Sequence, residues 1–223
     1  MIGSMRRRFL RFLFRLLYNE LAFTYNAIAW LVSLGKWQAW GRTALSRIKG
    51  QRVLEIGHGP GQLLVALARS GRSPIGIDLS PQMIDLAHRR IRRAKVDIPQ
   101  VRCRVQQLPF RSSSFDSALA AFPTDYIFSR STLREVERVT NDRGRLIVVW
   151  SGQLGSHPII TRFIEWLYRL TGQNEPLLNE QLVIFEEASL AAHFEQEFVG
   201  SSMVTLIVAD KFNRDNTAGR RPD

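Results

Sequence analysis

The fold is decided by residues 53–61, which read Val53-Leu54-Glu55-Ile56-Gly57-His58-Gly59-Pro60-Gly61. The first four residues are mostly apolar and predict a buried strand, and the three alternating glycines predict a tight turn after it. Helical spacing of apolar residues over 62–70 predicts a helix directly after the turn. A strand, glycine-rich turn and helix in this order predict a ligand site, because free N–H groups gather at a helix N-terminus.

The glycine spacing separates this turn from the G-x-G-x-x-G fingerprint of dinucleotide-binding proteins. That fingerprint needs a glycine where this chain has Gln62. Here an acid, Glu55, precedes Gly57 by two residues, and a second acid, Asp78, ends an apolar run 21 residues after Gly57. A carboxylate at the end of the second strand can accept hydrogen bonds from both ribose hydroxyls of a nucleoside.

The chain around this turn alternates between strand and helix patterns. Strands are predicted at 52–56, 74–78, 101–105, 115–121 and 145–150, and helices at 62–70, from Ser80-Pro81 onward, and at 132–140. Further helices are predicted at 158–170 and 186–195, before a hairpin formed by 198–199 and 203–209. These patterns predict an α/β fold, a Rossmann-like doubly wound and mostly parallel sheet with a terminal antiparallel hairpin and an N-terminal helical extension.

Positive charge is concentrated in the first two thirds of the chain. The 223 residues include 31 Lys and Arg against 20 Asp and Glu, a formal net charge of +11. Residues 1–50 carry a net +8, residues 51–149 a net +7, and residues 150–223 a net −4. This excess predicts an anionic partner, either nucleic acid or a membrane surface.

The single cysteine and the spacing of possible metal-ligating residues predict neither a disulfide nor a metal site. Cys103 is the single cysteine, which excludes an internal disulfide and fits a reducing, cytoplasmic location. No His, Asp or Glu cluster has metal-ligand spacing, so no metal site is expected.

Residues 5–18 predict a basic amphipathic helix. Arg8, Arg11 and Arg15 fall within one arc of that helix, and Phe and Leu cover the rest of its surface. Such a helix is typical of the membrane interface, and the arginines make the apolar run too short to span a bilayer. Packing of the same apolar face on the domain is the alternative. We therefore expect peripheral contact with the inner face of a membrane as one of two roles for this segment.

Four segments, in this order, resemble the class I S-adenosylmethionine-dependent methyltransferases. They are residues 55–61, 76–83 (Gly-Ile-Asp-Leu-Ser-Pro-Gln-Met), 108–116 (Leu-Pro-Phe-Arg-Ser-Ser-Ser-Phe-Asp) and 137–147 (Glu-Arg-Val-Thr-Asn-Asp-Arg-Gly-Arg-Leu-Ile). The third segment is similar to the subgroup that contains quinone-biosynthesis and small-molecule or lipid methyltransferases. The resemblance covers about residues 50–150 and continues more weakly to 210. It implies an enzyme with S-adenosyl-L-methionine as its cofactor.

The resemblance also implies which residues bind that cofactor. They are Glu55, Gly57, His58, Gly59 and Gly61 around the methionine portion, Asp78 at the ribose, Leu79 and Met83 beside the adenosine, and Gln106 and Gln107 near the adenine edge. One position departs from the family pattern, because Arg104 stands where an acid usually contacts the adenine amino group. Either Gln106 or a backbone carbonyl takes that role, or the cofactor binds more weakly.

Three residues are candidates for catalysis. Asp125 and Tyr126 follow the strand at 115–121, at the sheet edge where ligands of open α/β sheets bind, and His58 lies within the glycine turn. Each of them could orient an acceptor or take its proton. Asp125 could instead cap a turn, and His58 could instead shape the loop.

These observations predict a methyltransferase that acts on a small, lipophilic or membrane-associated acceptor. The alternatives are a nucleic-acid (rRNA) methyltransferase and a non-catalytic scaffold on the same fold. The expected organisation is a helical region over 1–49, the methyltransferase domain over 50–212 with an acceptor lid or helical insert at 151–195, and a flexible tail over 213–223.

Overall fold

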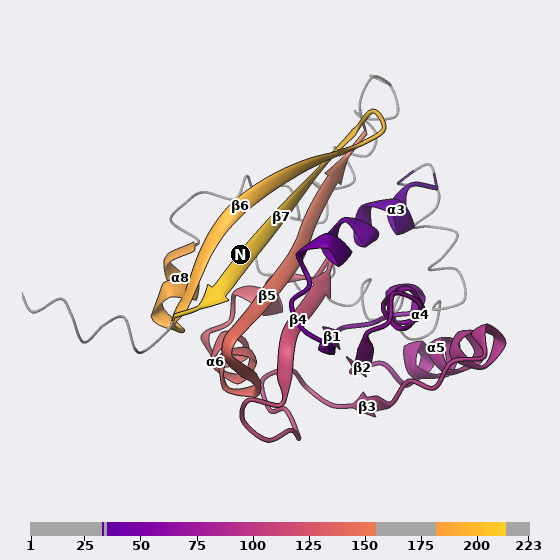
Figure 1. The fold of residues 1–223 in the computed structure, drawn as a ribbon, viewed down its shortest axis with the longest axis horizontal. Coiled ribbons are helices and arrows are strands. Elements are labelled where there is room, and N and C mark those ends of the chain that lie inside the picture. Colours follow the sequence, from indigo (N-terminus) through magenta and orange to yellow (C-terminus); the bar gives the residue numbers. More distant parts are fainter. Residues whose placement is uncertain (1–32, 34, 155–181, 213–223) are drawn as a thin grey trace, which may run out of the picture.

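The computed structural model describes residues 33, 35–154 and 182–212, which form one seven-stranded sheet flanked by helices (Figure 1). The strand order is β3-β2-β1-β4-β5-β7-β6. The strands are β1 (Arg52–Ile56), β2 (Ser73–Asp78), β3 (Gln100–Arg102), β4 (Phe115–Ala121), β5 (Thr140–Gln153), β6 (Leu190–Val199) and β7 (Ser202–Lys211).

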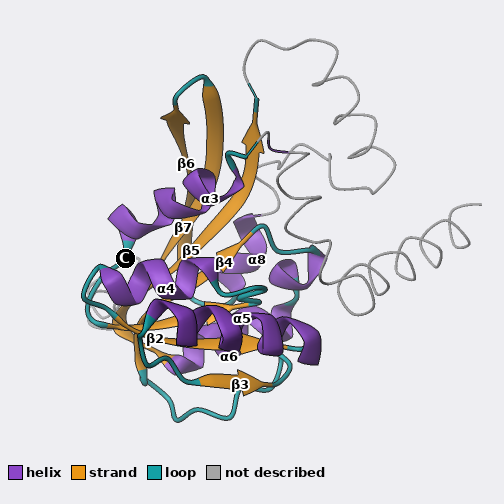
Figure 2. Cartoon of the chain, turned by 90° about the vertical axis from the view of Figure 1, so that its right-hand side faces the viewer, coloured by secondary structure: helices purple, strands orange, loops and turns teal. Residues whose placement is uncertain are grey.

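Helices cover both faces of the sheet, as predicted. One face carries α3 (Trp37–Arg42), the 3-10 turn η2 (Thr43–Arg47), α4 (Gln62–Arg69) and α5 (Pro81–Ala94). The other carries the 3-10 turn η3 (Asp125–Phe128), α6 (Arg130–Val139) and α8 (Val183–Glu187). Figure 2 shows α4 and α5 side by side over β2.

The strand directions confirm a Rossmann-like, mostly parallel sheet with an antiparallel hairpin. β1 pairs in parallel with β2 and β4, and β4 pairs in parallel with β5. β7 runs antiparallel to both β5 and β6. The carboxyl ends of β1, β2 and β4 therefore meet at one edge of the sheet, where the glycine turn also lies.

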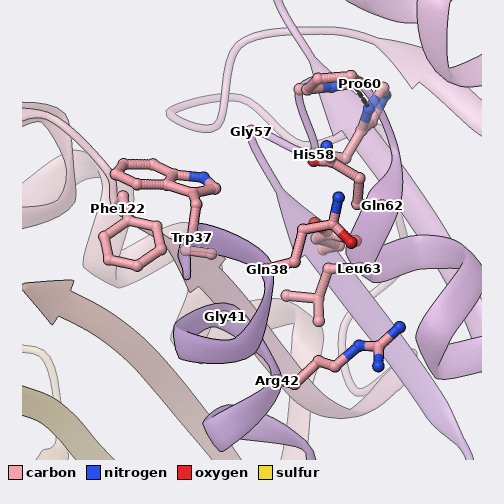
Figure 3. Close-up of a pocket in the computed structure, with 13 residues that line it drawn as sticks. Trp37, Gln38, Gly41, Arg42, Gly57, His58, Pro60, Gln62, Leu63 and Phe122 are labelled. Atoms are coloured by element: carbon pink, nitrogen blue, oxygen red, sulfur yellow. Dashed lines mark hydrogen bonds between the residues drawn. The ribbon is translucent and has the colours of Figure 1, made fainter. Parts of the chain in front are cut away.

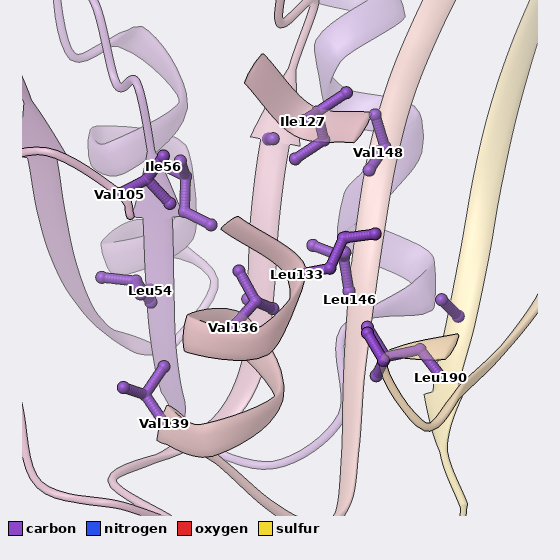
Figure 4. Packing of buried hydrophobic residues seen from close by; sticks show 14 of the residues in the cluster. Leu54, Ile56, Val105, Ile127, Leu133, Val136, Val139, Leu146, Val148 and Leu190 are labelled. Carbon is purple, nitrogen blue, oxygen red and sulfur yellow. The ribbon is translucent and has the colours of Figure 1, made fainter. Parts of the chain in front are cut away.

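The largest core cluster lies between the sheet and α6 (Figure 4). Leu133, Val136 and Val139 occupy the inner face of α6 at a spacing of three, which one face of a helix requires. They pack against Leu54 and Leu146 of the sheet, and all five side chains are fully buried. Burial of such a side chain stabilises the fold by about 2 kcal/mol, so this cluster fixes the sheet that carries the site.

The predicted start of α5 is confirmed in detail. Ser80 is the N-cap, and its hydroxyl accepts a hydrogen bond from the backbone N–H of Met83 at 3.3 Å. Pro81 follows in the first turn, where a missing N–H costs nothing. The direction of α5 away from Asp78 is therefore encoded locally.

The predicted helix at 186–195 is wrong. The helix in this region, α8, ends at Glu187, and Leu190–Val199 forms strand β6. Ala and Glu favour a helix locally, but all ten residues of β6 pair with β7, from Leu190 with Lys211 to Val199 with Ser202. Tertiary pairing thus overrides the helical propensity. The hairpin is confirmed but is longer than predicted.

Strands β3 and β5 differ at both ends from the predicted ranges 101–105 and 145–150. β3 covers only Gln100–Arg102, whereas β5 begins at Thr140 and continues to Gln153. The helices predicted at 5–18 and 158–170 and the tail at 213–223 fall outside the described residues, as does the middle of the predicted lid. Within the described part of the chain, no helix is long and apolar enough to span a membrane.

Candidate functional site

The glycine turn connects the end of β1 to α4. Gly57, Gly59 and Gly61 have φ angles of +65°, +52° and +75°, in the left-handed region that glycine adopts without a steric cost. The N–H groups of Gly57 and His58 both donate to the carbonyl oxygen of Ile77, at 2.8 and 3.1 Å. These bonds tie the turn to β2, so the loop has a fixed shape.

Asp78 lies beside this loop, as the spacing in sequence predicts. Its Oδ2 accepts a hydrogen bond from the N–H of Gly59 at 2.9 Å, and its Oδ1 accepts one from the N–H of Ser80 at 2.8 Å. The carboxylate therefore connects the end of β2 with both the turn after β1 and the start of α5. Each oxygen retains a further lone pair for a ligand hydroxyl.

Glu55 and His58 are polar side chains buried beneath the loop, only 3% and 4% exposed. Glu55 Oε2 and His58 Nε2 have no hydrogen-bond partner among the described residues. Burial, with a smaller effect of the Asp78 charge, raises the pKa of Glu55 well above its ordinary value. Burial lowers the pKa of His58, although Asp78 opposes this. Buried polar atoms without partners are rare in proteins and suit a site that a ligand completes.

The Glu55→Gln variant is expected to be more stable than the wild type at about pH 8 and equally stable at about pH 4. The folded protein holds the Glu55 proton that the unfolded chain loses above its ordinary pKa of 4.5. Stability therefore falls as pH rises from that value towards the raised pKa, by about 1.4 kcal/mol for each unit of difference. Glutamine removes this dependence, and denaturant unfolding at several pH values measures it.

Glu135→Gln is the control with the opposite sign. Its hydrogen bond with Arg138 lowers the pKa of Glu135, so this carboxylate stabilises the fold above pH 4.5. The glutamine variant at 135 should lose stability at neutral pH. Equal pH profiles for wild type and Glu55→Gln would contradict a raised pKa at Glu55.

Tyr126 is the catalytic candidate that the structure brings to the loop. It lies in η3, and a Cβ atom added to Gly57 would be 2.8 Å from its hydroxyl oxygen. The absence of a side chain at 57 therefore allows the Tyr126 hydroxyl to approach the turn. Asp125 is exposed at the start of η3, and no hydrogen bond or ion pair among the described residues joins it to the glycine turn.

The remaining predicted cofactor residues lie in two different environments. Leu79 is 54% exposed directly after Asp78, whereas Met83 is fully buried on the inner side of α5. Gln106 donates from Nε2 to the hydroxyl of Thr132 at 3.2 Å, and Gln107 is exposed.

The segment after Gln107 is fixed to α6 by an ion pair. Glu135 and Arg138 are joined at 2.7 Å. Glu135 accepts a hydrogen bond from the N–H of Leu108 at 2.7 Å, and Arg138 donates to the carbonyl oxygens of Leu108 and Phe110 at 3.0 and 2.7 Å. These bonds from α6 fix the backbone of the Leu108-Pro-Phe motif. They also fix the position of the neighbouring Gln106 and Gln107.

A cavity opens between α3 and the glycine turn (Figure 3). It is small, with about 50 Å³ of space open to water-sized molecules. Its lining combines the turn with side chains of α3, α4 and the end of β4: Trp37, Gln38, Gly41, Arg42, Glu55, Gly57, His58, Gly59, Pro60, Gln62, Leu63, Ala121 and Phe122.

Two aromatic rings form one wall of this cavity. The ring centroids of Trp37 and Phe122 are 3.9 Å apart, with planes inclined by 32°. Phe122 has a φ of +51°, an unusual conformation for a bulky residue, and its N–H donates to Val149 O at 2.8 Å. The sequence does not predict this pair, because the two residues lie 85 positions apart and no local pattern connects them.

The site fits a ligand with a polar amino-acid end and a ribose. The side-chain-free face of Gly57, the unpartnered atoms of Glu55 and His58, and the Asp78 carboxylate all face or adjoin the same loop. Among the described residues, no group of three or more His, Cys, Asp or Glu could hold a metal ion.

A sheet of this order, with the glycine turn after β1 and the acid after β2, agrees with the class I S-adenosylmethionine-dependent methyltransferases that the sequence resembles, and the chain contains a methyltransferase domain. The family model described as "Methyltransferase domain" matches residues 53–144. That match covers the glycine turn, Asp78 and Tyr126 but not α3, which carries Trp37.

Relatives in sequence place the chain near quinone methyltransferases. It is 31% identical over 162 residues to a demethylmenaquinone methyltransferase of Tropheryma whipplei, which covers 70% of this chain and 64% of the relative. It is 27% identical over 146 residues to a ubiquinone/menaquinone biosynthesis C-methyltransferase of Citrifermentans bemidjiense, covering 60% and 61%. The chain thus spans less than two thirds of the length of these relatives.

Solved structures share the fold at low sequence identity. The geranyl diphosphate C-methyltransferase of Streptomyces coelicolor, in complex with S-adenosyl-L-homocysteine, has a TM-score of 0.61 at 18% identity, covering 78% of this chain and 79% of that one. A phosphoethanolamine N-methyltransferase of Haemonchus contortus has a TM-score of 0.58 at 17% identity, covering 77% and 52%.

Proposed function

We propose that the protein transfers a methyl group from S-adenosylmethionine to a small, lipophilic acceptor. The observation that carries this proposal is the single cavity that joins the glycine turn to the aromatic wall of Trp37 and Phe122. The turn offers polar backbone and buried polar side chains, and the wall offers apolar surface. A polar cofactor at the turn and an apolar acceptor at the aromatic wall would match the chemistry of these two linings.

The proposed roles follow from the position of each residue. The backbone at Gly57, Gly59 and Gly61, with Glu55 below, would hold the amino-acid portion, and Asp78 would accept hydrogen bonds from the ribose hydroxyls. Leu79 would cover the base, and Gln106 and Gln107 would approach its edge, as the sequence predicts. Met83 would act from within the core by shaping the start of α5.

When bound, the cofactor supplies an electrophilic methyl group. The protein then contributes mainly orientation, because alignment of two reactants can supply a large part of the rate enhancement. Tyr126 would direct an acceptor hydroxyl or carbon towards the loop, since its own hydroxyl lies against Gly57. His58 is kept neutral by its lowered pKa, and its Nδ1 donates to the carbonyl oxygen of Gly59 at 2.7 Å, so its Nε2 could accept a proton. Asp125 would act only from the exposed rim of the site.

The class of acceptor is supported by the names of the relatives. The two relatives in sequence are named for demethylmenaquinone and for ubiquinone or menaquinone, which are quinones. We extend this preference to the present chain.

The test is methyl transfer from radiolabelled S-adenosylmethionine to a panel of reduced demethylmenaquinone, geranyl diphosphate, phosphoethanolamine and ribosomal RNA. We expect labelling of an isoprenoid or quinone acceptor. Tyr126→Phe should lower kcat by about tenfold to a hundredfold, because it removes one positioned hydroxyl near the reacting group. It should leave the affinity for S-adenosylhomocysteine within a factor of about two.

Arg130→Gln is the matched control, since Arg130 lies close in sequence but pairs with Glu187 on the surface, away from the cavity. Labelling of RNA alone would contradict the proposed acceptor class. A failure to bind S-adenosylhomocysteine at millimolar concentration would favour a scaffold on this fold.

A further inference from the structure

The strongest unassigned feature is a basic surface on α5 and β3. We define the basic face as the exposed residues Arg89, Arg92, Arg93, Lys95, Arg102 and Arg104. Between residues 62 and 104 the chain has nine Lys or Arg residues and only three acids. The face lies on the helix layer that Figure 2 shows beside β2 and β3. It does not belong to the cavity described above.

The basic face has no acidic partners among the described residues. Ion pairs between described residues occur elsewhere, on β1, β4–β7, α6, α8 and η2, through Arg47, Lys49, Arg52, Arg130, Arg138, Arg145, His193 and Lys211. On the basic face, Arg89 donates instead to the carbonyl of Asp85 at 3.3 Å, and Arg102 to that of Leu79 at 3.1 Å. These acceptors are neutral, and with its three acids the stretch from 62 to 104 still has a net charge of +6.

The spacing of these arginines brings like charges together. Arg89 lies three and four residues before Arg92 and Arg93, so the three side chains share one side of α5. The nearby Arg90 is half-buried, and burial together with the charge of Arg93 lowers its pKa. The helix dipole stabilises cations in the last turn of a helix, which here holds Arg92 and Arg93. It does not account for Arg89, which lies one turn earlier.

We propose that the basic face docks on a membrane surface rich in anionic lipids. The inference rests on the proposed function, because a lipophilic acceptor would partition into a membrane and reach the protein from there. Each basic residue near an anionic bilayer adds roughly 1 kcal/mol of attraction, and arginine pairs well with phosphate oxygens.

Lipid phosphate suits this surface better than single-stranded nucleic acid does. Binding of single-stranded nucleic acid relies on aromatic rings that stack on bases. Residues 62–104 contain no Phe, Tyr or Trp. The next aromatic residue, Phe110, packs edge-on against the buried Phe115 with ring centroids 5.0 Å apart. The basic face therefore offers charge without stacking surfaces.

Helix α5 also contacts the glycine turn. The guanidinium of Arg90 donates to the carbonyl oxygen of Pro60, within the glycine turn. Arg90 thus holds the loop from the inner side of the helix layer, while Arg89, Arg92 and Arg93 extend to solvent. Docking through the outer arginines would place the loop at the membrane without using the residue that supports it.

The test compares two variants of the full chain with equal loss of charge. One replaces Arg89, Arg92 and Arg93 with Gln, and the control replaces Arg111, Arg134 and Arg143, which are exposed elsewhere and have no ion pair to a described residue. Partition onto phosphatidylcholine vesicles with and without phosphatidylglycerol is measured by flotation. We expect the first variant to partition at least about tenfold more weakly onto the anionic vesicles, and the control less than about threefold.

Three results would overturn the inference. They are equal loss in both variants, unchanged binding in the first variant, or a greater loss of affinity for transfer RNA than for vesicles. Calorimetry with S-adenosylhomocysteine separates this inference from the proposed function. Normal cofactor binding with no vesicle effect rejects only the docking surface, whereas absent cofactor binding in the wild type rejects the proposed function.

Discussion

Asp78→Ala is expected to weaken the binding of S-adenosylhomocysteine by at least about a hundredfold, measured by calorimetry. Two effects combine in this variant. The proposed hydrogen bonds from the ribose hydroxyls to a carboxylate are lost, and hydrogen bonds to charged groups each contribute about 1.5–3 kcal/mol. The loop also loses its anchor, because Asp78 accepts the N–H groups of Gly59 and Ser80.

Asp85→Ala is the matched control, since Asp85 is an exposed acid seven residues further along, on α5. It should bind the ligand as the wild type does. Asp78→Asn should be intermediate, because the amide keeps one acceptor oxygen but no charge. Binding by Asp78→Ala within about fivefold of the wild type would show that Asp78 does not hold the ligand.

Gly152→Ala is expected to lower the free energy of unfolding by about 3 kcal/mol, measured in urea. Gly152 lies in β5 and packs against the ring of Trp40, which is 1% exposed. A Cβ atom at 152 would be 2.3 Å from Trp40 Cε3, far closer than an ordinary contact. The ring must shift within a filled core, and α3, which carries Trp37 on the cavity wall, must shift with it.

Gly41→Ala provides the control. Gly41 is also buried, in α3, but a Cβ atom there would meet nothing within 4 Å. Alanine at 41 should be neutral or stabilise the helix by about 0.5–1 kcal/mol. Trp40→Leu should restore part of the stability of the Gly152→Ala variant by relieving the clash. A wild-type urea midpoint for Gly152→Ala would show that Trp40 can move freely.

The sequence predicts the elements whose local pattern agrees with their surroundings. β1 and β4 have the predicted bounds, because each is an apolar run enclosed by the sheet. The start of α5 is predicted because Ser80 and Pro81 form a cap by themselves. The segment 186–195 is mispredicted because its Ala and Glu residues favour a helix, while its strand form depends on a partner in β7.

The candidate site also combines contacts that the sequence predicts with contacts that it does not. The glycine turn and Asp78 lie 21 residues apart with a characteristic spacing, so the sequence predicts that they meet. Trp37 and Phe122 lie 85 residues apart, and their contact depends on how α3 crosses the end of β4. The link between Arg90 and Pro60 likewise appears only once α4 and α5 are packed. Contacts of this kind have no local signature in one sequence.

The backbone of Phe122 shows that this position tolerates local strain for the sake of packing. A left-handed conformation costs a bulky residue about 1 kcal/mol or more, and glycine would relieve that strain. Glycine would also remove the phenyl ring that packs on Trp37 and on the core cluster of Trp40, and loss of an aromatic ring from a core costs up to about 3–5 kcal/mol. The packing therefore outweighs the strain, and the stability of the fold and the shape of the cavity wall favour the same side chain at position 122.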